Sequence, residues 1–131
     1  MRFLALDVGK RRTGLAFLDE ETGIPLPLET FHHSSSAQLI AHVESVKGER
    51  NIDVVVLGLP LLPSGTEGEQ AAFVREFGDR LIEKGIEVRY VDERFTTTQS
   101  AFSHTGAKSM TKHIDADAGA ACAILNMFLG Y

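Results

Sequence analysis

The chain has 131 residues, 44% of them hydrophobic, and a formal net charge of −5. This length and apolar content predict one compact domain over residues 1–131 that needs neither disulfides nor a structural metal to fold. A single cysteine excludes an internal disulfide and fits a reducing cytoplasm, and the acidic balance argues against indiscriminate nucleic-acid binding. Asp7 comes too early for a signal-peptide core, and Gly58 and Pro60 interrupt the longest apolar run, so we expect neither secretion nor a membrane span.

The first third of the chain predicts a β-hairpin, an edge strand and a helix. Residues 2–8 form a run that is apolar on both faces of a strand, residues 9–14 are typical of a turn, and residues 15–18 return as a second strand. After a turn-rich segment, residues 28–31 predict a third strand at the edge of the sheet. A run of serines then offers N-caps to a helix over about 36–47.

Strands and helices alternate through the rest of the chain. Residues 53–57 form a β-branched run that is typical of a buried parallel strand. A crossover helix should follow, with Thr66 and Glu69 as its capping box and Gly85 at its end. Residues 88–91 predict the next parallel strand. The remaining predicted elements are a helix at 96–105, a basic loop at 106–111 and a last helix at about 115–129.

This pattern predicts an α/β fold with a five-stranded mixed sheet in the order 3-2-1-4-5, flanked by helices. Right-handed crossovers place the fourth strand beside the first. Sites in such folds form outside the carboxyl ends of the central strands. We therefore expect Asp7, Gly58 and Glu93 to share one rim of the sheet.

Three acidic patterns lie where buried elements end. They are Asp7-Val8-Gly9-Lys10, Val91-Asp92-Glu93-Arg94 and Asp115-Ala116-Asp117. An unpaired buried charge is costly, so three such placements indicate a site and not chance. Asp117 shares a helical face with apolar residues and should point toward the sheet, whereas Asp115 points elsewhere and could cap the helix. Strand alternation leaves open whether Asp92 or Glu93 faces the crevice.

Clustered carboxylates without cysteine or paired histidine ligands favour Mg²⁺ or Mn²⁺ over Zn²⁺. Two such ions about 4 Å apart can activate a water and stabilise the leaving oxygen in phosphodiester cleavage. Basic residues adjoin the acidic patterns, as a site that acts on a phosphate polyanion would need. They are Lys10, Arg11, Arg12, Arg94, Lys108 and Lys112.

Four motifs in order resemble those of the YqgF/RuvX family of bacterial RNase H-like nucleases. They are Asp7-x-Gly9-Lys10-Arg11-x-x-Gly14, Gly58-Leu59-Pro60 with Gly65-Thr66-Glu67-Gly68, Asp92-Glu93-Arg94-x-Thr96-Thr97, and Asp117-x-x-Ala120-Ala121-x-x-Ile124-Leu125. The resemblance covers nearly the whole chain. It implies an RNase H-like fold, a cytoplasmic location and trimming of the 5′ end of precursor 16S ribosomal RNA. It also implies an older proposal, Holliday junction resolution.

The resemblance also assigns roles to individual positions. Asp7, Glu93 and Asp117 match the metal-binding and catalytic acids of the family. Phosphate contacts are implied for Lys10, Arg11 and Arg94, and Thr96 and Thr97 match a threonine pair. The segment 107–112, with Lys108 and Lys112, is less basic than in many members, which predicts a weaker grip on the substrate or a different substrate.

Other functions stay open at this point. The same site could act on branched DNA, because no reader of the RNA 2′-hydroxyl is recognisable. Sugar kinases and actin-like ATPases open with a similar hairpin, but this chain has room for one lobe and lacks a P-loop. A non-catalytic RNA-binding or ribosome-assembly module would need the acids only for structure. A homodimer is possible, since a resolvase needs a symmetric pair to cut two strands.

Overall fold

The computed structural model describes residues 1–93 and 116–129, with the side chains of the last helix described from Ala118 onward. The predicted helix at 96–105 and the predicted loop at 106–111 lie outside this part of the chain. The described elements are β1 (Arg2–Asp7), β2 (Arg12–Asp19), β3 (Leu26–Pro27), β4 (Phe31–His32), α1 (Ser36–Arg50), β5 (Val54–Leu59), α2 (Glu69–Glu83), β6 (Glu87–Asp92) and α4 (Ala116–Leu129).

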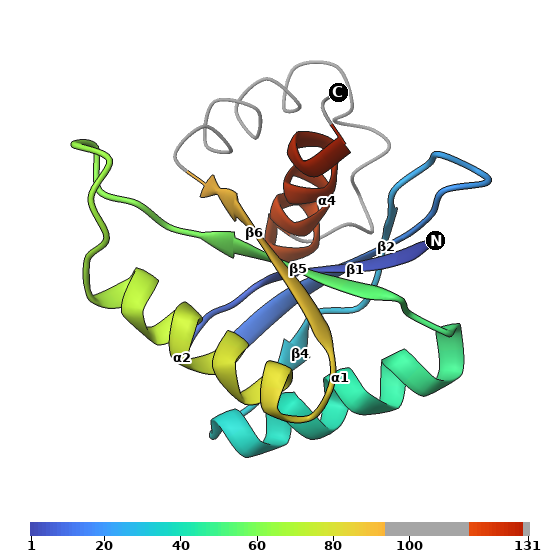
Figure 1. Ribbon diagram of the computed structural model, residues 1–131, viewed down its shortest axis with the longest axis horizontal. Coiled ribbons are helices and arrows are strands. Elements are labelled where there is room, and N and C mark those ends of the chain that lie inside the picture. Colours follow the sequence, from blue (N-terminus) through green and yellow to red (C-terminus); the bar gives the residue numbers. More distant parts are fainter. Residues whose placement is uncertain (94–115, 130–131) are drawn as a thin grey trace.

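One mixed sheet organises the fold, with the strand order β3-β2-β1-β5-β6. Strand β1 pairs antiparallel with β2 and parallel with β5, and β5 pairs parallel with β6. Helices α1 and α2 cover one face of the sheet and α4 covers the other, as Figure 1 shows. The α/β class and the predicted order 3-2-1-4-5 are confirmed, because β1, β2, β5 and β6 are the strands that the hydrophobic runs predict.

The predicted third strand is wrong in its detail. Residues 28–31 were expected to form one edge strand, but the structure has two shorter ones, β3 and β4, which pair with different parts of β2. Pro27 ends β3 and has no N–H to continue a ladder. After β3, the Leu28 N–H donates a hydrogen bond to the Leu15 carbonyl oxygen of β2 at 2.9 Å. The sheet therefore has six strands and not five.

The predicted capping box of α2 is also wrong. Gly68 is the N-cap residue, and no side chain caps the helix. Thr66 instead belongs to the preceding turn, where its hydroxyl lies 2.8 Å from the Ser64 hydroxyl and its carbonyl accepts from the Leu62 N–H. This tight turn holds Thr66 away from the helix end. The predicted C-terminal signal is confirmed, since Gly85 follows the helix with a φ of 82°.

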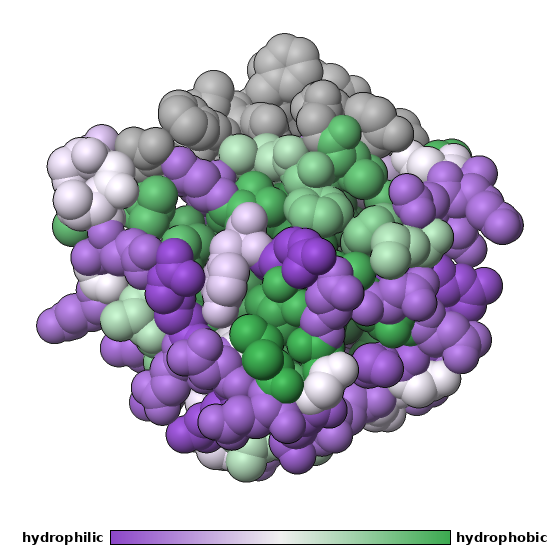
Figure 2. All heavy atoms as spheres, viewed as in Figure 1, coloured by the Kyte–Doolittle hydropathy of each residue, from purple (hydrophilic) through white to green (hydrophobic). Residues whose placement is uncertain are grey.

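Two cores lie on opposite faces of the sheet because successive strand residues point to opposite sides. Leu4, Leu6 and Val8 pack with α1 and α2, whereas Phe3 and Ala5 pack with α4. Hydrophilic residues cover most of α1 and α2 on the face shown in Figure 2, and apolar residues gather around α4. Both faces of the sheet therefore carry a buried core, and a side chain at the rim on the α4 face lies beside the second of them.

Across the described residues, none of the helices combines the length and the apolar character that crossing a bilayer requires.

Candidate functional site

Strand alternation places three residues at the rim of the sheet, on the face that α4 covers. Asp7 ends β1 two residues after Ala5, which belongs to the core under α4. Gly58 follows Val56 of the same core in β5. Glu93 comes just after β6, two residues beyond Val91, which packs against that core too. The predicted shared rim is thus present, and the period of two puts Glu93, and not Asp92, on this face.

The Asp7 and Glu93 side chains meet at this rim through a hydrogen bond between their carboxyl groups. Gly58 makes the approach possible. A Cβ atom at this position would lie 2.7 Å from Glu93 Cδ and 2.5 Å from Ile124 Cδ1 of α4. The absent side chain of Gly58 therefore leaves the space into which the Glu93 carboxyl and the Ile124 side chain of α4 fit.

Glu93 carries a proton at neutral pH. Burial, the hydrogen bond to Asp7 and the negative charge of Asp7, in that order of importance, raise the pKa of the Glu93 carboxyl to about 9. Two carboxyl groups in contact behave in this way because both cannot ionise without strong repulsion. The protonated Glu93 donates to the Asp7 carboxylate, and the pair holds one negative charge instead of two.

The raised pKa predicts the pH dependence of stability. The folded chain keeps a proton on Glu93 that the unfolded chain releases above about pH 4.5, so this group opposes folding increasingly from there to about pH 9. We expect Glu93→Gln, measured in EDTA by urea unfolding, to increase the free energy of unfolding by ~2 kcal/mol at pH 7. The gain at pH 5 should be less than half as large. The same change at exposed Glu83 should have no effect, and an equal gain at both pH values would contradict the shared proton.

Asp117, the third predicted acid, lies at the edge of the part of the chain that the structure describes. Asp117 is in the first turn of α4, but its side chain is not among those described. Other predicted residues lie outside the described residues altogether: Arg94, Thr96, Thr97, Lys108, Lys112 and the alternative acid Asp115. Among the side chains that the structure does describe, no three Asp, Glu, His or Cys residues gather closely enough to hold a metal ion. Asp7 and Glu93 are thus two possible ligands, and a third would have to come from a residue whose side chain the structure does not describe.

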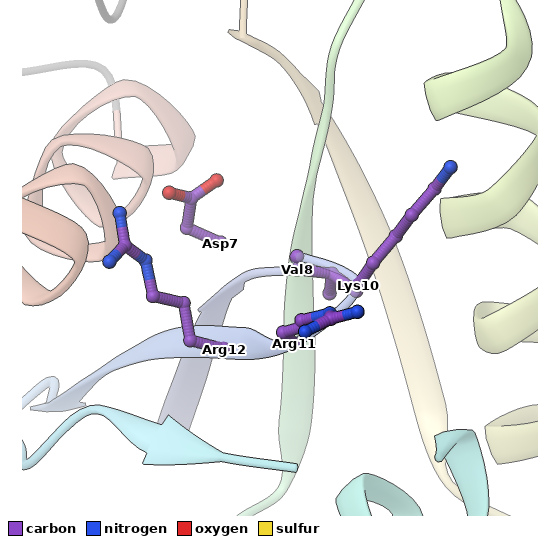
Figure 3. A pocket seen from close by; sticks show the side chains of 6 residues that line it. Asp7, Val8, Lys10, Arg11 and Arg12 are labelled. Carbon is purple, nitrogen blue, oxygen red and sulfur yellow. The ribbon is translucent and has the colours of Figure 1, made fainter. Parts of the chain in front are cut away.

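The turn after Asp7 forms a hollow at the edge of this site, which we call the acid-side hollow. It is lined by Asp7, Val8, Gly9, Lys10, Arg11 and Arg12. Figure 3 shows the Arg12 side chain on the same side as Asp7, toward α4, whereas the Lys10 side chain extends the other way. Of the two predicted phosphate contacts here, Lys10 thus points away from Asp7, while Arg11 lies in the turn between Lys10 and Arg12.

Arg12 was named among the basic residues beside the acidic patterns, but it was not assigned a phosphate contact. It begins β2, and Ala16 and Leu18, an even number of residues later, belong to the core under α4. The period of two therefore assigns Arg12 to the same face as Asp7, and that signal was present in the sequence. A residue that the prediction missed is Gln70 of α2, whose Nε2 donates to the Val8 carbonyl at 3.3 Å. No local pattern predicts a contact across 62 positions.

Comparison with known proteins places this geometry in a class. The structure matches that of RuvC from Thermus thermophilus in complex with a Holliday junction, with a TM-score of 0.63 at 15% identity over 99% of this chain and 96% of that one. It also matches the large terminase nuclease of the thermophilic phage G20c, with a TM-score of 0.61 at 12% identity over 97% and 81% of the two chains. The fold is therefore RNase H-like, as the sequence predicted.

The family follows from the sequence itself. The family model described as "RuvX: Holliday junction resolvase" matches residues 1–131, and the chain belongs to this family. Curated relatives carry the name "Putative pre-16S rRNA nuclease". The protein from Tropheryma whipplei is 36% identical over 97% of this chain and 85% of its own length. The protein from Agathobacter rectalis is 35% identical over 100% and 96%. The resemblance drawn from the four motifs is confirmed.

Proposed function

We propose that this chain is a divalent-metal-dependent endonuclease that hydrolyses phosphodiester bonds in structured RNA and trims the 5′ end of precursor 16S ribosomal RNA. The observation that carries the proposal is the pair of carboxyl groups, Asp7 and Glu93, held together over Gly58 at the rim of the sheet. A protein fold does not hold two partly buried acids in contact for stability, because each opposes the ionisation of the other. Functional sites are where such pairs are found.

The residues present fit a hard divalent cation. Carboxylate oxygens are the ligands that Mg²⁺ and Mn²⁺ prefer, and the pair already attracts a positive charge, at present a proton. Asp7, Glu93 and Asp117 would hold the metal. Two bound ions would supply an activated water and charge stabilisation for the leaving oxygen. The chain contributes the partial burial of the pair, the space above Gly58, and Arg12 beside Asp7 as a cation near the phosphate.

The substrate assignment rests on the names of the relatives, which point to precursor rRNA. The same proposal places the protein in the cytoplasm, where ribosomal RNA is processed. The second candidate is Holliday junction resolution, which the description of the family model favours. A junction would require two copies of the chain to make symmetric cuts, so a homodimer belongs to this second candidate.

One assay separates these functions. Purified protein is incubated with an end-labelled fragment that spans the 5′ end of precursor 16S rRNA, and separately with a four-way DNA junction, each with Mg²⁺, with Mn²⁺ and with EDTA. We expect metal-dependent cleavage of the RNA that leaves a 5′-phosphate. Preferential cleavage of the junction would favour the resolvase. If neither polymer is cut with either metal while both are bound, the chain is a binding module and the proposal is wrong.

A further inference from the structure

A second hollow lies on the other side of the hairpin turn, and we call it the helix-side hollow. It is lined by Lys10, Arg11, His32, His33, Ser34 and Gln38. Lys10 and Arg11 also line the acid-side hollow, so these two cations form the shared wall between the two. Among the described residues that line it none is acidic, although the chain as a whole has a net charge of −5. The helix-side hollow is therefore a locally positive place next to the acid pair.

Helix α1 begins at this hollow. Ser35 caps the helix by accepting from the Gln38 N–H at 3.3 Å, and Gln38 Oε1 accepts in turn from the Ser34 N–H at 2.7 Å. The first turn of this 15-residue helix contains no acid to offset the positive end of its dipole. Free N–H groups and the dipole at a helix start both favour an anion.

His33 supplies an independent indication of a ligand. The residue is only 8% exposed, and its Nε2 lies 2.9 Å from the hydroxyl of fully buried Thr13. The other ring nitrogen, Nδ1, is buried without a hydrogen-bond partner, alone in this among the side-chain atoms described. If the Thr13 hydroxyl donates to Nε2, Nδ1 carries the proton and is a donor without an acceptor. A buried donor of this kind destabilises the fold unless an oxygen accepts from it.

The backbone fixes this arrangement. The His33 N–H donates to the Arg11 carbonyl at 2.8 Å, which ties the end of β4 to the hairpin turn. Burial and the neighbouring His32 lower the pKa of His33, so the ring is neutral and presents a single N–H. The hollow thus combines two cations and a helix start, and the histidine with the unpartnered ring nitrogen is one of its lining residues.

We propose that the helix-side hollow binds a second backbone phosphate of the nucleic-acid substrate, flanking the phosphate that is cleaved at Asp7 and Glu93. Lys10 and Arg11 then contact the backbone of the nucleic acid where it passes between the two hollows. This contact gives a role to the Lys10 side chain, which points away from Asp7. The inference rests on the proposed nuclease function, but the contact itself concerns binding and not cleavage. A phosphodiester of either RNA or DNA satisfies the chemistry.

The test is Gln38→Glu, which places a negative charge in the hollow without disturbing the fold. A glutamate three residues after the N-cap Ser35 completes a capping box, so the helix should be at least as stable as before. Binding of the precursor rRNA fragment and of the four-way DNA junction is measured by fluorescence anisotropy in EDTA, where no cleavage occurs. We expect the variant to bind about tenfold more weakly, and the slope of log K against log salt to become shallower by about 0.9, as for one lost phosphate contact.

The matched control is Ser45→Glu, which adds the same charge to the exposed face of α1 about 10 Å further along the helix. It should bind with the affinity and salt slope of the parent. The inference is overturned if Gln38→Glu binds like the parent, or if Ser45→Glu weakens binding equally. If Gln38→Glu weakens binding of only the RNA fragment or only the DNA junction, that polymer supplies the phosphate. Failure of the parent to cleave would refute the proposed nuclease function and leave this result standing.

Discussion

Replacing Asp7 by Asn should abolish metal-dependent cleavage while leaving the fold intact. The amide keeps the shape of the side chain and can still accept the hydrogen bond from Glu93, but it lacks the charge that a divalent cation needs. The expected loss in kcat is roughly a thousandfold, about 4 kcal/mol of transition-state stabilisation. The measurement is single-turnover cleavage of the labelled precursor rRNA fragment in saturating Mg²⁺.

Asp79→Asn is the matched control for this result. Asp79 is an exposed acid of α2, so the same chemical change there should leave cleavage at the rate of the parent. Thermal unfolding should show that the Asp7→Asn chain is folded. If that chain cleaves as fast as the parent, Asp7 is not a metal ligand, and the interpretation of the carboxyl pair as an active site is wrong.

Gly58→Ala should damage both stability and activity. The new Cβ atom would lie 2.5 Å from Ile124 Cδ1 and 2.7 Å from Glu93 Cδ, so the Ile124 and Glu93 side chains must move. Overpacking of this kind lowers the free energy of unfolding by about 1–3 kcal/mol. A displacement of about 1 Å in a catalytic group reduces the rate by about a hundredfold. Urea unfolding and the cleavage assay measure the two effects separately.

A second glycine provides the control for Gly58. A Cβ atom at Gly48, in helix α1, would meet nothing within 4 Å. Gly48→Ala should therefore raise the free energy of unfolding by about 0.5–1 kcal/mol, through helix propensity alone, and leave cleavage unchanged. A Gly58→Ala chain with the activity of the parent would show that Glu93 needs no particular position over β5.

The framework of the fold was predictable because its signals are local. The apolar runs of β1 and β5, the mixed apolar and charged pattern of β6 and the amphipathic pattern of α2 need no knowledge of partners. The handedness of crossovers then orders the strands. The two wrong details concern segments whose conformation depends on their neighbours. The short strands β3 and β4 depend on pairing with β2, and Thr66 is held in a turn by bonds that no helix signal reveals.

The candidate site was predictable only in part. The position of Asp7 at a strand end and the glycine at residue 58 were signals in the sequence. The choice between Asp92 and Glu93 required the end of β6 to be known to within one residue, because a shift of one position reverses the face. The place of Arg12 on the face of Asp7 was not predicted for a related reason, since it depends on where β2 begins after the turn. The role of Asp117 stays a prediction.

The most direct test of the carboxyl pair as a metal site is diffraction from crystals of this protein soaked in Mn²⁺, with the ion located by its anomalous signal. We predict a peak within coordination distance of carboxylate oxygens of both Asp7 and Glu93, with the hydrogen bond between them replaced by the ion. Asp117 is the expected third ligand. If saturating Mn²⁺ leaves this rim without a peak and the two carboxyl groups still bonded to each other, the account of the site is contradicted.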